Sequence, residues 1–326
     1  MTGRNEYSLK AVREAAERIR AVLPEGSVAE NEPMSQHTSF RTGGPACELV
    51  TCCSEEELAE VLKICAGTDG AAHMLIGNGS NLLVSDEGYP GIVIKLGGSF
   101  SDVSIDEDAD SGSTEDHVIV RAGAARLLSS VSTFVTEHGL SGMEFASGIP
   151  GSMGGAVFMN AGAYGGEMKD IVSSVRLMKQ DGGEITELPA EEMDFGYRHS
   201  MVEDSGLIVL SAALKLTPDD PEAIAARVRE LQEKRNAKQP VNYPSAGSTF
   251  KRPAGGFAAA LIDEAGLKGF RIGGAMVSEK HAGFVINTGG ATTADVLAVM
   301  RHVRETVWEK SGIMLEPEVR LINCSL

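Results

Sequence analysis

The chain lacks the features that mark secreted, membrane-spanning and metal-binding proteins. Its five cysteines are odd in number and show no CxxC spacing: Cys47, Cys52, Cys53, Cys65 and Cys324. This pattern argues against a disulfide framework and against a zinc site, and it favours reduced thiols. No stretch approaches about 18 uninterrupted apolar residues, and the opening residues MTGRNEYSLK contain no apolar signal core. We therefore expect a soluble, cytoplasmic protein without membrane contact.

Basic residues are scarce as well. The 29 Lys and Arg face 46 Asp and Glu, which gives a formal net charge of −17. A nucleic-acid-binding protein needs a basic surface, so this balance excludes that class. A local group of Lys and Arg can still bind one anionic small molecule. Proline is also rare, with 12 residues, whereas the 38 glycines gather in short blocks beside apolar runs and suggest close backbone approach to a ligand.

The 326 residues are enough for two or three folded units. Apolar spacing predicts helices over 8–23, 54–65, 257–265 and 293–310, and strands over 73–76, 92–96, 118–124, 207–216 and 284–287. Ser54 as N-cap and Glu57 three residues later predict a capping box at the start of the second helix. These elements follow no regular βαβ period, so we predict an α+β fold.

A domain boundary is predicted near residue 218, because Asp220-Pro221 is typical of a helix start. This gives domains over 1–217 and 218–326, with a last strand over 315–322. The acidic stretch 101–116 has almost no apolar residues. We interpret it as a solvated loop and expect it to be dispensable.

Two glycine-rich segments could bind phosphate groups. GNGSNLL (77–83) follows a predicted strand, where backbone N–H groups can surround phosphate oxygens. It lacks the GxGxxG-plus-helix layout of a Rossmann site, and a plain tight turn explains it equally well. The block 146–168 is denser in glycine and would suit a large flat or charged ligand, with structural turns as the alternative.

Three further residues could carry chemistry, although each also has a structural explanation. Arg198 lies in DFGYRHS, Ser248 in YPSAGSTFKRP and Glu318 in LEPEV. Taken singly, they could be a surface ion pair, a turn hydroxyl after Gly247 and an exposed strand residue next to Pro317.

The motifs in their order resemble one family, the UDP-N-acetylenolpyruvoylglucosamine reductases. The resemblance covers roughly residues 31–322 and rests on HTSFRTGGPA (37–46), GNGSNLL, GIPGSMGGAVFMNAGAYGGE (148–167), GYRHS, YPSAGSTFKRP and KHAGFVIN (280–287). The short segment between Arg198 and Ser248 resembles the branch that lacks the inserted substrate-capping loop with its tyrosine. No residue role tied to that loop is therefore carried over.

The resemblance implies a fold and a cofactor site. The fold is a two-lobed FAD-binding domain of the vanillyl-alcohol-oxidase-like type, with its lobes split near 75–95, followed by an α+β substrate domain. The cofactor is non-covalent FAD, and NADPH is the hydride donor. The residues that would hold FAD are Arg41, Thr42, Gly43, Gly77, Asn78, Gly79, Ser80, Asn81, Leu82, Gly148, Ile149, Pro150, Gly151, Ser152, Gly154, Gly155, Asn160 and Gly162.

The resemblance also implies an oxidoreductase of peptidoglycan synthesis, a UDP-N-acetylmuramate dehydrogenase that acts on UDP-N-acetylglucosamine enolpyruvate. We expect a monomer. Arg198 and Glu318 would stabilise charge on the substrate carboxylate, and Ser248 would deliver the final proton. The substrate would be bound by Tyr197, Lys238, Lys251 and Arg252, with solvated surface positions as the alternative for the two lysines.

Two other functions stay open at this point. Another flavoprotein of the same FAD fold, such as an alcohol or lactone oxidase, would share the glycine blocks but would not require Ser248, Glu318 and the basic loop. A flavin- or nucleotide-sugar-binding sensor would tolerate the loss of Arg198, Ser248 or Glu318. All three residues are present.

Overall fold

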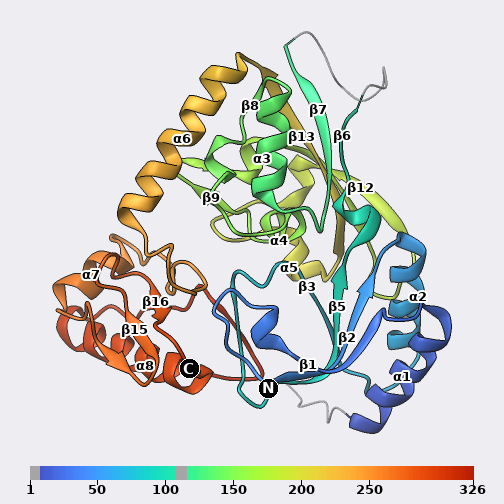
Figure 1. The fold of residues 1–326 in the computed structure, drawn as a ribbon, viewed down its shortest axis with the longest axis horizontal. Coiled ribbons are helices and arrows are strands. Elements are labelled where there is room, and N and C mark those ends of the chain that lie inside the picture. The colour runs from blue at the N-terminus through green and yellow to red at the C-terminus, as the bar shows by residue number, and fades with distance from the viewer. Residues whose placement is uncertain (1–7, 107–115) are drawn as a thin grey trace. The chain divides into compact units, whose positions relative to one another are not determined.

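The computed structural model describes residues 8–106 and 116–326 (Figure 1). By their contacts these residues form two units. Unit 1 comprises the chain up to Ala29, Glu48–Asn78 and Gly91–Glu233, and unit 2 comprises Glu30–Cys47, Gly79–Pro90 and Lys234–Leu326. Helices mix with mostly antiparallel strands in each unit, which confirms the α+β class.

Unit 1 is built on a six-stranded antiparallel sheet. Its order is β12 (Ile185–Pro189), β11 (Val172–Met178), β13 (Ile208–Pro218), β7 (Val118–Gly123) and β6 (Val103–Ile105), with the short β8 (Leu140–Ser141) beside β13. The predicted apolar strand 207–216 is the central strand β13, and its residues from Ile208 to Leu214 are all buried. Helices α3 (Leu128–Glu137) and α4 (Met153–Phe158) complete the core on this sheet (Figure 1).

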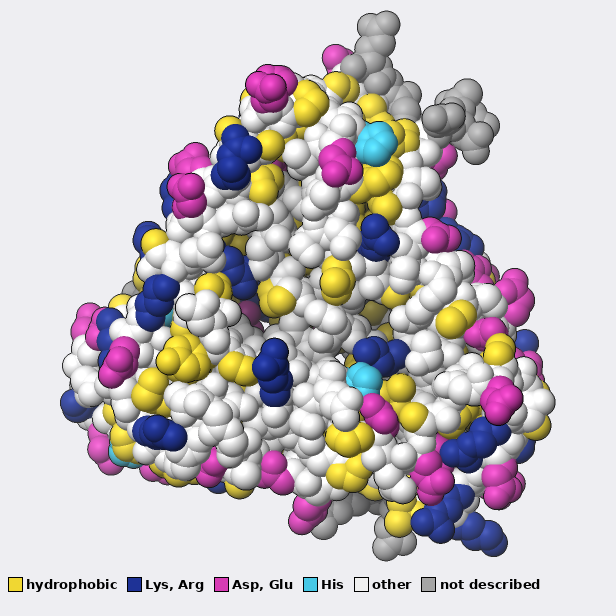
Figure 2. Space-filling view, viewed as in Figure 1, with side chains coloured by type: hydrophobic (Ala, Val, Ile, Leu, Met, Phe, Trp, Pro, Cys, Tyr) yellow, Lys and Arg dark blue, Asp and Glu magenta, His cyan; other side chains and the backbone are white. Residues whose placement is uncertain are grey.

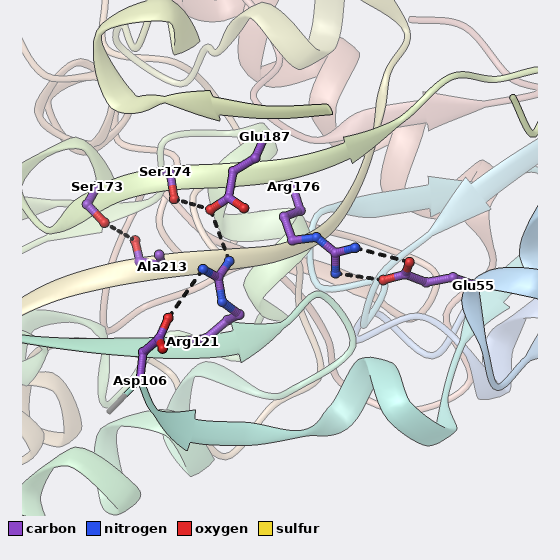
Figure 3. Close-up of polar contacts among 8 residues, drawn as sticks. All are labelled: Glu55, Asp106, Arg121, Ser173, Ser174, Arg176, Glu187 and Ala213. Atoms are coloured by element: carbon purple, nitrogen blue, oxygen red, sulfur yellow. Dashed lines mark hydrogen bonds and ion pairs between the residues drawn. The ribbon is translucent and has the colours of Figure 1, made fainter. Parts of the chain in front are cut away.

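The sheet also carries ion pairs that tie its strands together (Figure 3). Arg121 lies 3.1 Å from Glu187 and 3.4 Å from Asp106. Arg176 donates two hydrogen bonds, of 2.7 and 3.2 Å, to the carboxylate of Glu55 in the first turn of α2 (Glu55–Ala66). A bidentate pair of this kind fixes the helix against strand β11.

A smaller sheet has the order β1 (Val28–Pro33), β2 (Pro45–Cys52), β5 (Tyr89–Leu96) and β3 (His73–Ile76), and the chain passes between the two units within β1, β2 and β5. Helix α1 (Leu9–Val22) packs against α2. The predicted N-cap at Ser54 is confirmed, because its hydroxyl accepts a hydrogen bond from Glu57 N. The other half of the predicted capping box is wrong, because the Glu57 carboxylate accepts from Cys53 N and not from Ser54 N.

Unit 2 contains a three-stranded antiparallel sheet of β14 (Arg271–Ile272), β15 (Ala275–Val277) and β16 (Val285–Asn287), with α7 (Ala258–Glu264) and α8 (Thr293–Ser311) packed around a shared core. Strand β17 (Arg320–Ile322) pairs in parallel with β4 (Leu82–Val84). Phe40 and Leu83 from the two earlier segments are buried in this core. They explain why those segments belong to unit 2.

Two expectations need correction. The predicted strand 315–322 is regular only over β17, because the segment before it makes only an isolated bridge, between Pro317 and Phe250. The predicted acidic loop begins later, since β6 pairs with β7, and residues 107–115 lie outside the described residues. Helix α6 (Pro221–Lys238) starts at the predicted signal. By contacts, Lys234–Leu326 forms unit 2 together with the two earlier segments Glu30–Cys47 and Gly79–Pro90. The functional boundary near 218 stays a prediction.

Candidate active site

The strongest candidate for a phosphate site in unit 1 surrounds the hydroxyl of Ser152. Ser152 lies just before α4, and among the residues that the structure describes its Oγ is buried and has no hydrogen-bond partner. Gly77 follows strand β3, and a Cβ added there would overlap this Oγ. A Cβ at Gly155 would lie 3.6 Å from it. A buried hydroxyl beside two missing side chains is suited to donate to an anionic oxygen of a ligand.

The loop after β3 is also held to the glycine block by a side chain. Asn78 Nδ2 donates to the carbonyl of Pro150 at 2.6 Å, so residues 77–78 and 148–152 lie together in unit 1. The sequence separates these segments by about seventy positions. Their contact places the two predicted glycine blocks at one location.

At two positions of the predicted cofactor set, packing within the protein explains why the residue is glycine. A Cβ at Gly154 would approach the Cβ of Ala124 to 2.9 Å, so this glycine lets α4 pack against the end of β7. A Cβ at Gly162 would lie 2.7 Å from the carbonyl of Gly166 in the hairpin of β9 (Gly162–Ala163) and β10 (Gly166–Glu167). For these two positions the structural-turn explanation accounts for the glycine.

Of the remaining predicted cofactor residues, Asn160 belongs to unit 1 and the others belong to unit 2. Arg41 is exposed with φ 56°, and Gly43 has φ 114°. Thr42 is buried, and its hydroxyl lies 3.2 Å from that of Thr293 at the start of α8. A Cβ at Gly79 would overlap the carbonyl of His37. Contacts within unit 2 therefore explain both the threonine at position 42 and the glycine at position 79.

Ser248 and Glu318 are brought together in unit 2. Glu318 N donates to the carbonyl of Thr249 at 2.8 Å, and Lys251 N donates to the carbonyl of Glu316 at 2.9 Å. The two segments therefore run side by side. Asn81 Nδ2 adds a bond of 3.1 Å to the carbonyl of Glu318, so the 79–82 loop is attached to the same place.

Thr249 is the residue that fixes this pairing. It is 1% exposed, its N–H donates to Gly283 O at 2.9 Å, and its hydroxyl accepts from Val285 N at 3.0 Å. With every polar group of Thr249 bonded, the neighbouring Ser248 is held at a defined, partly exposed position. Nothing in the sequence pattern singled out Thr249.

Arg198 occupies a strained turn in unit 1. Gly196 N donates to His199 O at 3.0 Å, which closes the turn, and Arg198 has φ 55°. Its Nη2 lies 3.5 Å from the carbonyl of Gly162, and its guanidinium lies 5.3 Å from the centre of the Tyr197 ring. A non-glycine residue in the left-handed region persists only where its surroundings hold it, and such residues cluster at functional sites.

One residue with a left-handed backbone, Tyr164, was not predicted from the sequence. In the described part of the chain the left-handed non-glycine residues are Asn31, Arg41, Asn160, Tyr164, Asp194, Arg198 and Asn323. Tyr164 is 45% exposed at the tip of the β9–β10 hairpin, inside the glycine block. A Tyr-Gly pair within a glycine block was the available sequence signal for a tight hairpin.

The predicted substrate-binding residues are all exposed. Lys238 ends α6, and Tyr197 is 51% exposed. Lys251 lies 3.9 Å from the exposed carboxylate of Glu316, a weak surface pair. Arg252 lies 4.5 Å from the centre of the Phe257 ring, which is 59% exposed and was not predicted.

On the face shown in Figure 2, lysines and arginines are scattered among uncharged and acidic side chains. Among the described helices none is both long and apolar enough to cross a membrane, and no group of three or more His, Cys, Asp or Glu in residues 8–106 and 116–326 is placed to hold a metal ion. All five cysteines are free.

The match to a known cofactor-binding domain defines the class of protein, which is a flavin-binding protein. A family model described as "FAD binding domain" matches residues 48–188, which contain the Ser152 site. A second model, described as "UDP-N-acetylenolpyruvoylglucosamine reductase, C-terminal domain", matches residues 239–322, which contain Ser248 and Glu318.

Similar proteins identify the family. The chain is 47% identical to the UDP-N-acetylenolpyruvoylglucosamine reductase of Agathobacter rectalis, over 92% of this chain and 96% of that protein. The Clostridioides difficile reductase is 46% identical over 93% and 95%. The crystal structure of the Thermus caldophilus reductase is 38% identical, with a TM-score of 0.74 over 90% and 98%. The chain belongs to the UDP-N-acetylenolpyruvoylglucosamine reductase family, as the motifs predicted.

Proposed function

We propose that this chain catalyses the NADPH-driven, FAD-dependent reduction of UDP-N-acetylglucosamine enolpyruvate to UDP-N-acetylmuramate, a step of peptidoglycan precursor synthesis. The observation that carries the proposal is the pairing of the Ser248 segment with the Glu318 segment, in the part of the chain matched by the C-terminal model of this reductase family. An oxidase that only shares the FAD domain has no need for this arrangement.

The residues of the chain fit FAD. In unit 1, Ser152 and the glycines at 77 and 155 would bind its phosphates, together with Asn78 and Gly148–Gly151. The family resemblance also assigns Arg41, Gly43 and the segment Gly79–Leu82 of unit 2 to the cofactor. When bound, FAD supplies a two-electron store that takes a hydride from NADPH and passes it to the vinyl carbon of the substrate.

The chain's own residues would handle the charge that this hydride creates. Addition to the vinyl carbon leaves negative charge on the neighbouring carbon and its carboxylate. Arg198 would stabilise it by its positive charge, and Glu318 could do so only with a proton on its carboxyl group. Ser248 would donate a proton to the carbon that bears the carboxylate, which yields the lactyl ether. Substrate, NADPH and one proton are thereby converted to product and NADP⁺.

The uridine diphosphate would be bound by the exposed basic residues of unit 2. Lys238, Lys251 and Arg252 can each donate charge-assisted hydrogen bonds to its phosphates. Tyr197 in unit 1 would contact the sugar nucleotide beside Arg198.

The compartment and the assembly state belong to the same proposal. Burial raises the pKa of Cys52 to about 12 and that of Cys65 to about 11, so both stay protonated thiols near neutral pH. Five free cysteines suit a reducing cytoplasm. We expect a monomer, which sedimentation of the holoenzyme would test.

Absorbance spectroscopy without oxygen tests the proposed reaction. The purified protein should be yellow, NADPH should bleach it, and UDP-N-acetylglucosamine enolpyruvate should restore the colour with formation of UDP-N-acetylmuramate. A colourless protein, or a reduced protein that this nucleotide leaves bleached, would count against the proposal. Restoration by oxygen together with oxidation of an alcohol would instead favour the oxidase.

A further inference from the structure

The side chain of Asn160 is used entirely within unit 1, although the motif suggested a cofactor contact. It is 1% exposed. Its Nδ2 donates to Gly196 O at 2.9 Å and to Glu167 Oε2 at 3.0 Å, and its Oδ1 accepts from Lys169 N at 2.9 Å. An amide has two N–H donors, and both are occupied here. This side chain therefore has no donor left for a ligand.

The contacts of Asn160 lead to Arg198. Gly196, which accepts from Asn160, is the first residue of the turn closed by His199. The turn presents Arg198 in the left-handed conformation, which needs support from its surroundings. Asn160 supplies that support from α4's C-terminal end, and its own φ of 41° shows that it is itself held in an unusual conformation.

Glu167 accepts a hydrogen bond from Asn160 and lies in the hairpin whose Gly162 faces Arg198. It pairs with Gly162 across the β9–β10 hairpin, and the carbonyl of Gly162 lies 3.5 Å from Arg198 Nη2. Lys169 Nζ lies 2.8 Å from Glu167 Oε2. This hydrogen-bonded ammonium lowers the pKa of Glu167 most, with smaller contributions from Asn160 and the charge of Arg198. Glu167 is thus a carboxylate whose charge Lys169 already balances in part.

We propose that Asn160 and Glu167 are positioning residues for Arg198. Asn160 fixes the turn, and Glu167 sets the direction of the guanidinium without neutralising it, so that Arg198 can receive the carboxylate of the substrate. This inference rests on the proposed function of Arg198. It also predicts that both residues affect affinity only through Arg198, and only the affinity for ligands that carry the carboxylate.

Binding of two nucleotides to the holoenzyme tests this. UDP-N-acetylmuramate carries the carboxylate, whereas UDP-N-acetylglucosamine lacks it. By isothermal titration, Asn160→Ala and Glu167→Gln should each weaken the first about tenfold, as residues coupled to a common partner do, and leave the second within about twofold. Reduction of the flavin by NADPH should also stay near the wild-type rate.

A double-mutant cycle separates positioning from general damage. In an Arg198→Ala background, Asn160→Ala should change neither affinity by more than about twofold. Asn287→Ala is the matched control: Asn287 is 6% exposed, and its amide likewise bonds backbone groups, including Phe40 O at 3.0 Å. This variant should lower the melting temperature while the ratio of the two affinities stays unchanged.

The outcomes are distinguishable. Equal weakening of both nucleotides, or a further loss of affinity in the Arg198→Ala background, would overturn the positioning role. If Asn160→Ala does not fold, Glu167→Gln decides the question, because its side chain is partly exposed and keeps its shape. A wild-type enzyme that binds both nucleotides equally would overturn the inference together with the role proposed for Arg198.

Discussion

The Ser152→Ala substitution should change folding and cofactor binding in opposite directions. In the described residues Ser152 Oγ is buried without a hydrogen-bond partner. A buried unpaired polar group costs about 1–3 kcal/mol, so the substitution should not destabilise the FAD-free protein. Even a gain of about 1 kcal/mol would raise its melting temperature by about 2–4 °C.

The same substitution should weaken the binding of FAD. A hydrogen bond from Ser152 to a charged phosphate oxygen contributes about 1.5–3 kcal/mol, which corresponds to about 10- to 150-fold in Kd. The assay is to remove FAD reversibly, record the melting temperature, and titrate FAD back while following flavin fluorescence. An unchanged FAD affinity, or a melting temperature lowered by several degrees without FAD, would refute the assignment of Ser152 as a phosphate donor.

Gly77→Ala provides a matched control. The added Cβ would overlap Ser152 Oγ, and overpacking of this kind costs about 1–3 kcal/mol. In the Ser152→Ala background the next contact, the Cβ at position 152, lies 3.7 Å away, an ordinary van der Waals distance. The double variant should therefore regain stability but still bind FAD weakly. An equal loss of stability in both backgrounds would contradict the geometry.

Three further predictions address other parts of the chain. Ser248→Ala should leave reduction of the flavin by NADPH near the wild-type rate and slow its re-oxidation by the enolpyruvyl nucleotide by about 10²–10⁴-fold. Stopped-flow absorbance measures both half-reactions, and equal slowing of the two would remove Ser248 from the proton-donating role. Burial is the main cause that lowers the pKa of His281 below its unfolded value near 6.5. Because the unfolded chain then binds the extra proton first, the free energy of unfolding should fall as pH drops below about 6.5. Denaturant titrations of His281→Asn should show a smaller decrease of this free energy over the same pH range. Arg176→Ala should cost about 1 kcal/mol, because the pair with Glu55 is bidentate but about one third exposed, and in a Glu55→Gln background most of this loss should disappear.

Local sequence signals predicted the secondary structure well where they did not depend on distant contacts. Nearby residues decide the N-cap at Ser54, the helix start at Pro221 and the buried strand β13. Local hydrogen bonds and apolar spacing are enough to form these features, whichever segment packs against them. The family could likewise be recognised from its long motifs in their order. This is why the fold class and the cofactor were predictable.

The roles of individual glycines could not be read from the sequence. Gly77 and Gly154 look alike there, yet one borders the buried Ser152 hydroxyl and the other lets α4 pack against β7. The difference depends on which atom a Cβ would meet, and that atom belongs to a segment far away in the sequence. Asn160 is the same case, because its motif suggested a ligand contact and its bonds go to the chain itself.

What the sequence by itself determined is therefore the family, the α+β class and the cofactor, since these are carried by short contiguous motifs. The tertiary structure alone decided the pairing of the Thr249 and Glu318 segments, the hydrogen bond from Asn160 to the turn that contains Arg198, and the inclusion of Glu30–Cys47 and Gly79–Pro90 in unit 2. All three depend on hydrogen bonds and apolar burial between segments distant in sequence. Such contacts form only when the whole chain packs, and no local pattern encodes them.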